Sequence, residues 1–276
     1  MRRLFVLVLL LGGVATLPAQ DIRLPMKDGS VKFAVIGDTG TGDSHQLDVA
    51  KQLNYYRSKF QFPFVLMMGD NLYSGDAPKD YQKEFERPYK PLLDVGVKFY
   101  ASLGNHDNPN ERLYKPFNMN GERYYTFKPA GSSVRFFALD RNYMDDKQLA
   151  WLEDDLKGRS TSQPIVVFAH IPLWSVYPDW GWGTEDAAQA LGYLKRFGSV
   201  TVLNGHIHQV MQKVEGNVTF HTARSTAFPQ PAPGTAPSPG PLKVPEEKLR
   251  SLLGTANVTF KQNEQRLAII DTTLQA

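Results

Sequence analysis

The sequence predicts an α/β fold, and three of its features lead to that prediction. Short apolar runs recur along the chain and are typical of buried strands. Stretches with helical periodicity lie between many of these runs. The runs are continuous rather than alternating with polar residues, which favours a sheet covered on both faces. A hydrophobic fraction of 42% in 276 residues suits a soluble globular core.

The expected elements follow in order from residue 31. In the first half we expect strands at residues 31–38, 62–70, 97–103, 123–128 and 134–140, the last two forming a hairpin or part of a second sheet. The expected helices are residues 44–59 with Asp43 or Ser44 as the cap, 80–93 interrupted by Pro88 and Pro91, and the amphipathic segment 145–157. In the second half we expect strands at 165–168, 200–203, 210–214, 218–222, 258–261 and 267–271, and a helix at 184–197.

The first twenty residues have the pattern of a secretory signal peptide. Arg2 and Arg3 precede a short apolar run at residues 4–14, and small residues follow, with Ala19-Gln20 as a plausible end. The run is shorter than the about 20 apolar residues that span a bilayer. An uncleaved anchor is the alternative, and a twin-arginine export signal is a weaker one. We expect a secreted or periplasmic protein with one domain at residues 21–276 and no stable membrane anchor after cleavage.

Charge and cysteine content narrow the possible functions. Removing residues 1–20 removes two Arg and lowers the formal net charge from +3 to +1, so no nucleic-acid partner is expected. The chain has no Cys, which excludes thiolate metal sites and Cys nucleophiles. Residues 229–245 are rich in Pro and form either a surface loop or a flap over the active site. A short helix is expected near residues 243–250.

Metal-type side chains stand at the ends of five successive predicted strands. They are Asp38, Asp70, Asn105 with His106, His170, and His206 with His208. In open α/β sheets, functional crevices lie outside the carboxyl ends of strands. Two residues apart in extended chain, His206 and His208 share a face at about 6–7 Å, which suits one imidazole per metal of a close pair. The pattern predicts a two-metal hydrolytic centre.

The same positions carry a family resemblance. The chain resembles the calcineurin-like metallophosphoesterases, and among them the purple acid phosphatases, whose blocks are G-D-x-G, G-D-x-x-Y, G-N-H-D/E, V-x-x-H and G-H-x-H. This sequence has Gly37-Asp38-Thr39-Gly40, Gly69-Asp70-Asn71-Leu72-Tyr73, Gly104-Asn105-His106-Asp107, Val167-Phe168-Ala169-His170 and Gly205-His206-Ile207-His208. The resemblance covers residues 31–222, more loosely the last strands, and implies a four-layer α/β/β/α sandwich of two mixed sheets flanked by helices.

One exchange favours the purple acid phosphatase branch. Most metallophosphoesterases have D-x-H in the first block, where the His is a ligand, but position 40 is Gly here. Tyr73 can replace that ligand, and a phenolate favours Fe(III); the alternative is that Tyr73 only packs in its loop. The resemblance implies Fe(III) at Asp38, Asp70, Tyr73 and His208, and Fe(II), Zn or Mn at Asp70, Asn105, His170 and His206, with Asp70 bridging.

The resemblance also implies a function and a general acid. It implies hydrolysis of phosphate monoesters by a hydroxide that bridges the metals, with His106 protonating the leaving oxygen. Asp107 either orients His106 or caps the loop. The alternatives are a phosphodiesterase, for example on cyclic nucleotides, and a non-catalytic binding scaffold. The expected partner is a small phosphorylated substrate.

Substrate contacts are less defined by the sequence. Many purple acid phosphatases have a further His after V-x-x-H, whereas this chain has none between His170 and His206 and offers Asp179 instead. Tyr177, Trp180 and Trp182 form either an aromatic wall for a substrate or loop packing. Arg224 either reaches a phosphate or forms a surface salt bridge.

Overall fold

The computed structural model describes residues 29–140, 142, 144–183, 187–261 and 267–274. The expected signal peptide lies outside this range, as do the first residues of the helix expected at 184–197. In the part described, no helix is both long and apolar enough to cross a membrane.

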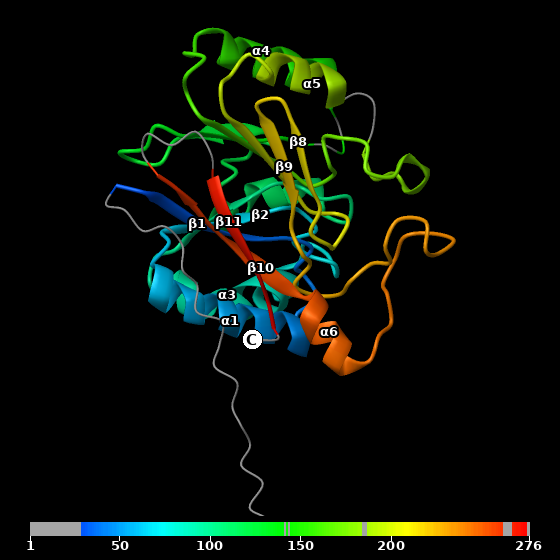
Figure 1. The fold of residues 1–276 in the computed structure, drawn as a ribbon. Coiled ribbons are helices and arrows are strands. Elements are labelled where there is room, and N and C mark those ends of the chain that lie inside the picture. Colours follow the sequence, from blue (N-terminus) through cyan, green and yellow to red (C-terminus); the bar gives the residue numbers. More distant parts are fainter. Residues whose placement is uncertain (1–28, 141, 143, 184–186, 262–266, 275–276) are drawn as a thin grey trace, which may run out of the picture.

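Two mixed sheets form the centre of the molecule (Figure 1). The first has the order β11-β10-β1-β2-β3, built from β1 (Val31–Ile36), β2 (Phe64–Met67), β3 (Lys98–Ala101), β10 (Gly254–Phe260) and β11 (Leu267–Thr273). The second has the order β4-β5-β6-β7-β9-β8, built from β4 (Tyr125–Phe127), β5 (Arg135–Ala138), β6 (Ile165–Ala169), β7 (Val200–Asn204), β8 (Gln212–Glu215) and β9 (Val218–Thr222).

Both sheets combine parallel and antiparallel pairs: in the first sheet the parallel strands form one half, and in the second they form the centre. In the first sheet β1, β2 and β3 are parallel, and β10 and β11 pair antiparallel. In the second, β5, β6, β7 and β9 are parallel, and β4 and β8 add antiparallel edges. The carboxyl ends of the parallel strands therefore gather at one side of each sheet, where a site can form.

Helices cover the outer face of each sheet. Helices α1 (Ser44–Phe60) and α3 (Arg87–Asp94) lie against the first sheet, and α4 (Asp146–Lys157) and α5 (Ala187–Leu194) lie against the second (Figure 1). The predicted four-layer α/β/β/α sandwich is thus confirmed. Adjacent residues of β5 show the layers: Phe136 packs edge-on against Phe33 of the other sheet, whereas Phe137 belongs to the cluster under α4 and α5.

Helix starts follow the capping chemistry that the sequence contains. The Asp43 carboxylate accepts from the backbone N–H of Gln46 at 3.0 Å and begins α1, and Asp145 does the same for Gln148 at 2.9 Å. A short helix, α6 (Glu246–Leu252), follows the Pro-rich loop.

Most predicted bounds differ from the structure by up to three residues, and the largest differences concern the helix at 80–93 and the start of β10. The helix expected at 80–93 is one helical run with three parts: α2 (Pro78–Tyr81), a π-helical turn at Gln82–Glu86, and α3. Pro88 and Pro91 lie within this run without ending it, and the carbonyl of Glu84, which Pro88 has no N–H to pair with, accepts from Gln46 Nε2 at 2.7 Å instead. Strand β10 begins four residues earlier than expected because Gly254 already pairs with Thr273. Strand β8 begins two residues later than expected, at Gln212.

Candidate metal centre

The predicted ligand residues follow the carboxyl ends of strands from both sheets. Asp38 and Asp70 follow β1 and β2, Asn105 follows β3, and His170 follows β6, with His206 and His208 after β7. Backbone contacts connect the two groups of loops: the N–H of His206 donates to both Asp38 oxygens at 3.0 and 3.2 Å. The site therefore lies where the strand ends of the two sheets meet.

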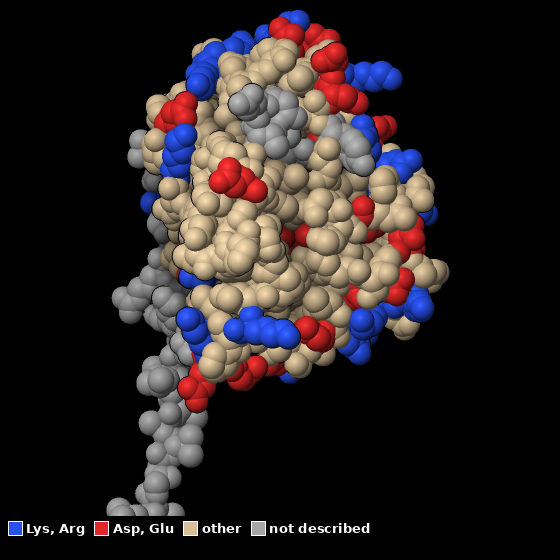
Figure 2. Space-filling view, turned by 90° about the vertical axis from the view of Figure 1, so that its right-hand side faces the viewer, with Lys and Arg blue, Asp and Glu red and all other residues tan. Residues whose placement is uncertain are grey.

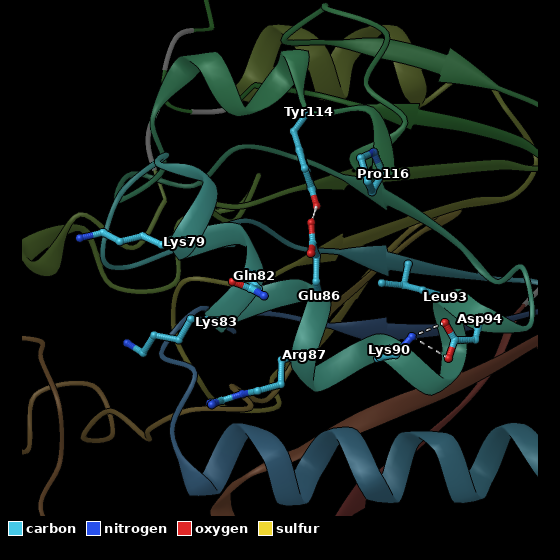
Figure 3. Close-up of a pocket in the computed structure, with 10 residues that line it drawn as sticks. All are labelled: Lys79, Gln82, Lys83, Glu86, Arg87, Lys90, Leu93, Asp94, Tyr114 and Pro116. Atoms are coloured by element: carbon cyan, nitrogen blue, oxygen red, sulfur yellow. Dashed lines mark hydrogen bonds and ion pairs between the residues drawn. The ribbon is translucent and has the colours of Figure 1, made fainter.

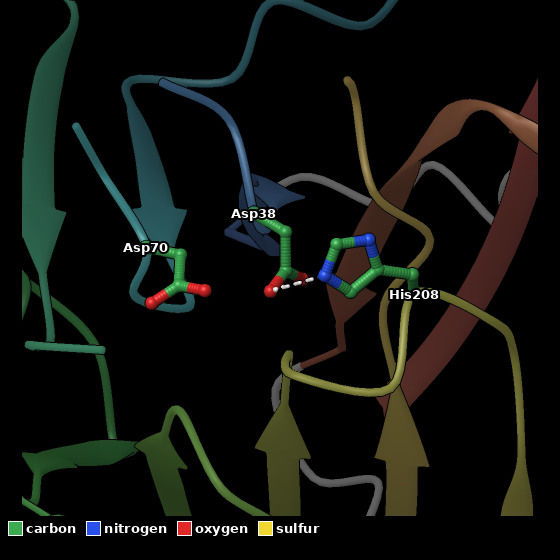
Figure 4. Close-up of side chains that lie close together, drawn as sticks. All are labelled: Asp38, Asp70 and His208. Atoms are coloured by element: carbon green, nitrogen blue, oxygen red, sulfur yellow. Dashed lines mark ion pairs between the residues drawn. The ribbon is translucent and has the colours of Figure 1, made fainter. Parts of the chain in front are cut away.

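Asp38, Asp70 and His208 form a compact cluster (Figure 4). One ligand atom from each lies within 4.8 Å of the others, and all three side chains are buried. His208 Nε2 lies 3.2 Å from Asp38 Oδ1. Two buried carboxylates next to one another are costly unless a cation compensates them, so this arrangement favours a metal ion.

The hydrogen bonds of His170 indicate which ring nitrogen is free to bind a metal. Its Nδ1 lies 2.8 Å from the carbonyl oxygen of Met68, which can only accept, so Nδ1 carries the proton. In the neutral ring, Nε2 then has a lone pair. It lies 3.0 Å from Asn105 Oδ1, 3.3 Å from Asp70 Oδ1 and 3.1 Å from His206 Nδ1. His170 Nε2 and these three neighbouring atoms can all act as metal ligands, so a cation bound among them would interact favourably with each.

His208 repeats this pattern on the other side of the cluster. Its Nδ1 lies 2.5 Å from the carbonyl oxygen of Phe228, which leaves Nε2 directed at Asp38. At metal-binding His residues, a carbonyl commonly accepts from the ring nitrogen that does not bind the metal and so fixes the imidazole tautomer. Burial acts to lower the pKa of His208, but the charge of Asp38 outweighs it and raises the pKa.

The electrostatic environment keeps Asp70 and His206 in metal-binding form. Burial opposes the charge of Asp70, but His170 and the N–H of His106 outweigh it and lower the pKa of the Asp70 carboxyl. Burial first, and His170 second, lower the pKa of His206 to about 3. At neutral pH the site thus presents a charged Asp70 and a neutral His206.

Tyr73 lies against the Asp70 carboxylate. Its hydroxyl donates to Asp70 Oδ2 at 3.1 Å, and its ring lies between His106 and Phe228, with centroid distances of 5.2 and 5.4 Å. Burial, followed by the charges of Asp38 and Asp70, raises the pKa of Tyr73 well above its ordinary value. The phenol therefore keeps its proton unless a cation replaces it.

Position 40 has no room for a side chain. A Cβ atom on Gly40 would lie 2.2 Å from the carbonyl oxygen of Asn71 and 2.3 Å from the Cα of Leu72. The backbone N–H of Tyr73 donates to the carbonyl of Gly40 at 2.9 Å. The glycine at position 40 and the loop that carries Tyr73 are therefore packed directly on one another.

Four of the predicted ligands have left-handed backbone conformations. Asp38, Asp70, His206 and His208 have φ between 50° and 69°. Such conformations are uncommon outside glycine and cost about 1–3 kcal/mol each. Their concentration at one site is typical of backbone held in a strained geometry for function.

His106 and Asp107 have different positions in the next loop. The His106 side chain is exposed beside Tyr73, and its N–H donates to Asp70 Oδ1 at 3.0 Å. The Asp107 carboxylate accepts from the N–H groups of Gly104 at 2.7 Å and Asn71 at 2.6 Å. The structure thus supports the loop-capping role of Asp107. Burial and the nearby Asp70 carboxylate raise its pKa to about 7.

The available donors fit hard and borderline cations. They are carboxylate, phenol, amide and imidazole groups, and the chain has no thiol. Oxygen and imidazole ligands suit Fe, Zn and Mn. The residues present therefore fit a pair of such metals.

Among the residues expected to contact substrate, Asp179, Trp180 and Trp182 lie in one loop after β6, and Arg224 lies in the segment after β9. Trp182 is fully buried against Trp180, so it does not offer an open wall. Trp180 is half-buried, and Asp179 is exposed on the same turn. Arg224 donates to the carbonyl of Leu252 at the end of α6, at 3.4 Å.

The Pro-rich loop is fastened to the metal-binding segment at its base. Gln230 Nε2 donates to the carbonyl of His206 at 2.9 Å, and the N–H of Leu242 donates to the carbonyl of Pro229 at 2.8 Å. The base of the loop thus contacts the site, and its tip is exposed.

Sequence reasoning missed a residue that holds the Tyr73 loop. Glu84 is fully buried in the π-helical turn, and its carboxylate accepts from the N–H groups of Tyr73 and Ser74 at 3.0 and 3.2 Å. Its only sequence signal is an acidic residue in an amphipathic helix, where a solvent-facing position is the ordinary expectation.

Comparisons with known proteins agree with this geometry. The family model described as calcineurin-like phosphoesterase matches residues 31–210. Purple acid phosphatase 7 of Arabidopsis thaliana is 30% identical over 148 residues, which cover 49% of this chain and 45% of that protein. The match therefore spans less than half the length of that relative.

Solved structures show the same fold at low identity. A Plasmodium protein described as "GAP50 the anchor in the inner membrane complex" superposes with a TM-score of 0.69 at 18% identity, covering 89% of this chain and 85% of that one. A dimetal phosphatase from Danio rerio superposes with a TM-score of 0.67 at 14% identity, covering 88% of this chain and 96% of that one. With the family match over most of the described chain and the strand-end cluster of donors, the protein belongs to the calcineurin-like phosphoesterase family.

Proposed function

We propose that this chain is a metal-dependent phosphatase of the purple acid phosphatase type that hydrolyses phosphate monoesters. One observation carries the assignment within the family: position 40 cannot hold the His of the D-x-H block, and the Tyr73 hydroxyl lies 3.1 Å from Asp70. A site that lacks that imidazole needs another ligand, and Tyr73 is the donor at hand.

The proposed ligand assignment is supported by two groups of contacts: His208 lies against Asp38, and His170 lies against Asn105 and His206. Asp38, Tyr73 and His208 would hold Fe(III), and Asn105, His170 and His206 would hold Fe(II), Zn or Mn, with Asp70 shared. When bound, the cations neutralise phosphate oxygens and activate water near neutral pH. Tyr73→Phe should abolish the visible phenolate-to-iron absorption of iron-loaded protein; a mutant that keeps this absorption would contradict the iron assignment.

His106 is the proposed general acid. Its ring is exposed beside Tyr73, and its backbone is fixed by the bond to Asp70 Oδ1. From this position it can donate a proton to the leaving oxygen of a phosphate held by the cations. Asp107 supports the loop without contacting the substrate.

Two segments near the site, residues 170–183 and 225–242, favour a singly phosphorylated substrate. Residues 170–183 and 225–242 contain no Lys or Arg. Figure 2 shows this side of the molecule, with Lys and Arg gathered around its periphery. A substrate with a second phosphate would find no cationic side chain on these two segments, whereas a single phosphate is neutralised by the metals.

Export is proposed on the sequence alone, because residues 1–20 lie outside the described part. The prediction is that N-terminal sequencing of protein recovered outside the cytoplasm begins near residue 21. Recovery of the protein with residues 1–20 attached would contradict cleavage.

Relative rates on an aryl phosphate monoester and an aryl phosphate diester test the proposed function. We expect the metal-loaded protein to prefer the monoester and to lose activity with a chelator. A preference for the diester would favour the phosphodiesterase alternative. The Plasmodium structure is described as an anchor, so a binding role is the other alternative; loaded protein without hydrolysis of either ester would favour it.

A further inference from the structure

The Glu84 side chain makes several hydrogen bonds to the Tyr73 loop. Besides the N–H groups of Tyr73 and Ser74, its carboxylate accepts from the Ser74 hydroxyl and lies 3.2 Å from Lys83 Nζ. Burying a carboxylate is unfavourable unless such donors compensate it. These donors compensate the burial of the Glu84 carboxylate, and the carboxylate in turn fixes the backbone of residues 73 and 74.

The segment that Glu84 holds determines where the Tyr73 hydroxyl lies. The Tyr73 N–H is shared between Glu84 Oε2 and the carbonyl of Gly40, and the hydroxyl reaches Asp70 at the other end of the side chain. Fixing the backbone at residues 73 and 74 fixes the starting point of the tyrosine side chain. A shift of the loop would move the phenol oxygen away from Asp70.

The helix that carries Glu84 is also unusual. Glu84 lies in the π-helical turn Gln82–Glu86, where the N–H of Arg87 donates to the carbonyl of Gln82. π-Helical turns are rare and are frequently found at functional sites. The backbone of this turn is tied to the first block as well, because Gln46 Nε2 donates to the carbonyl of Glu84 at 2.7 Å and Gln46 Oε1 accepts from the N–H of Gly42.

We propose that Glu84 is a positioning residue that sets Tyr73 for metal binding through the backbone of residues 73 and 74. The inference depends on the proposed role of Tyr73 as a ligand. It deepens the proposed function by assigning to the π-helical turn the task of presenting that ligand.

A matched control lies two residues away on the same helical run. Glu86 has the same charge, but its carboxylate accepts from the Tyr114 hydroxyl at 2.6 Å in an open groove lined by basic side chains of α2 and α3 (Figure 3). Glu86→Gln therefore removes one charge from the same helical run without touching the Tyr73 loop. Both it and Glu84→Gln preserve side-chain size.

The experiment is a double-mutant cycle on metal affinity. Fe(III) binding to metal-free protein is measured by competition with a chelator for wild type, Glu84→Gln, Tyr73→Phe and the double variant. Residues behind first ligands typically change metal affinity by about 10–100-fold. We expect such a loss in Glu84→Gln, wild-type affinity in Glu86→Gln, and almost no further loss when Glu84→Gln is added to Tyr73→Phe.

Two results would overturn the proposal. One is an equal loss of affinity from Glu84→Gln in the wild-type and Tyr73→Phe backgrounds, which shows a structural role independent of tyrosine. The other is an equal effect of Glu86→Gln. If Glu84→Gln does not fold, Ser74→Ala removes one of the same contacts, and its loss of affinity must likewise vanish with Tyr73→Phe. Failure of the proposed function is separate: wild-type protein would bind metal through Tyr73 but hydrolyse no phosphate ester.

Discussion

Gly40→Ala tests the direct packing of the first block on the Tyr73 loop. The added Cβ would lie 2.2 Å from the oxygen and 2.6 Å from the carbon of the Asn71 carbonyl, and 2.3 Å from the Cα of Leu72. Nonbonded carbon atoms prefer about 3.5–4.0 Å, so the backbone must move by more than 1 Å. Overpacking of this kind costs about 1–3 kcal/mol, and we expect the upper end because the clashing atoms are backbone.

The assay is the free energy of unfolding in urea, with Gly192→Ala as the control. Gly192 lies in α5, and a Cβ there meets no atom within 4 Å. That substitution should stabilise the protein by about 0.5–1 kcal/mol because alanine is the better helix former. If Gly40→Ala stays within about 0.5 kcal/mol of wild type, the contact between Gly40 and the Tyr73 loop does not have the importance that we assign to it.

Three further predictions follow from the same structure. Burial, followed by the Asp107 carboxylate, raises the pKa of Glu111 from 4.5 to about 10. The native state thus keeps a proton that the unfolded chain loses above about pH 4.5, and stability falls with pH across this window by up to about 1.4 kcal/mol per unit. Glu111→Gln removes that slope, so its urea midpoint should exceed wild type by more at pH 8 than at pH 5; an equal difference at both would contradict the assignment. His106→Ala should slow alkyl phosphates by about 10²–10⁴-fold and nitrophenyl phosphate far less, because only the alkoxide needs a proton; equal losses would mean that His106 positions phosphate instead. Asp70→Ala should lose both metals and Asp38→Ala only one, as elemental analysis can show; loss of a single ion in each would exclude a shared ligand.

The residue pattern predicted buried strands and the candidate ligands at their ends for a simple physical reason, whereas the four layers were implied by the family resemblance. Continuous apolar runs require a sheet buried on both faces, and polar residues at the ends of parallel strands gather at one edge. The structure brings Asp38, Asp70 and His208 together in this way, with His170 against Asp70. The positions of strand-end residues are predictable because each depends only on the strand that the residue follows.

Features that depend on contacts between distant segments could not be predicted. The burial of Glu84 depends on the loop eleven residues earlier that it holds, and an isolated helix pattern does not contain that loop. Trp182 is buried because its hairpin folds it against Trp180, although an aromatic residue in a loop fits a substrate wall equally well. The π-helical turn also depends on tertiary packing, since helical periodicity in sequence does not distinguish α from π hydrogen bonding.

The metal content of the purified protein, measured together with its activity on an aryl phosphate monoester, tests the central claim most directly. We predict two metal ions per chain, with activity that disappears as a chelator removes them and returns when they are restored. Full activity in metal-free protein, or a loaded protein with a single ion per chain and undiminished activity, would contradict a two-metal phosphatase.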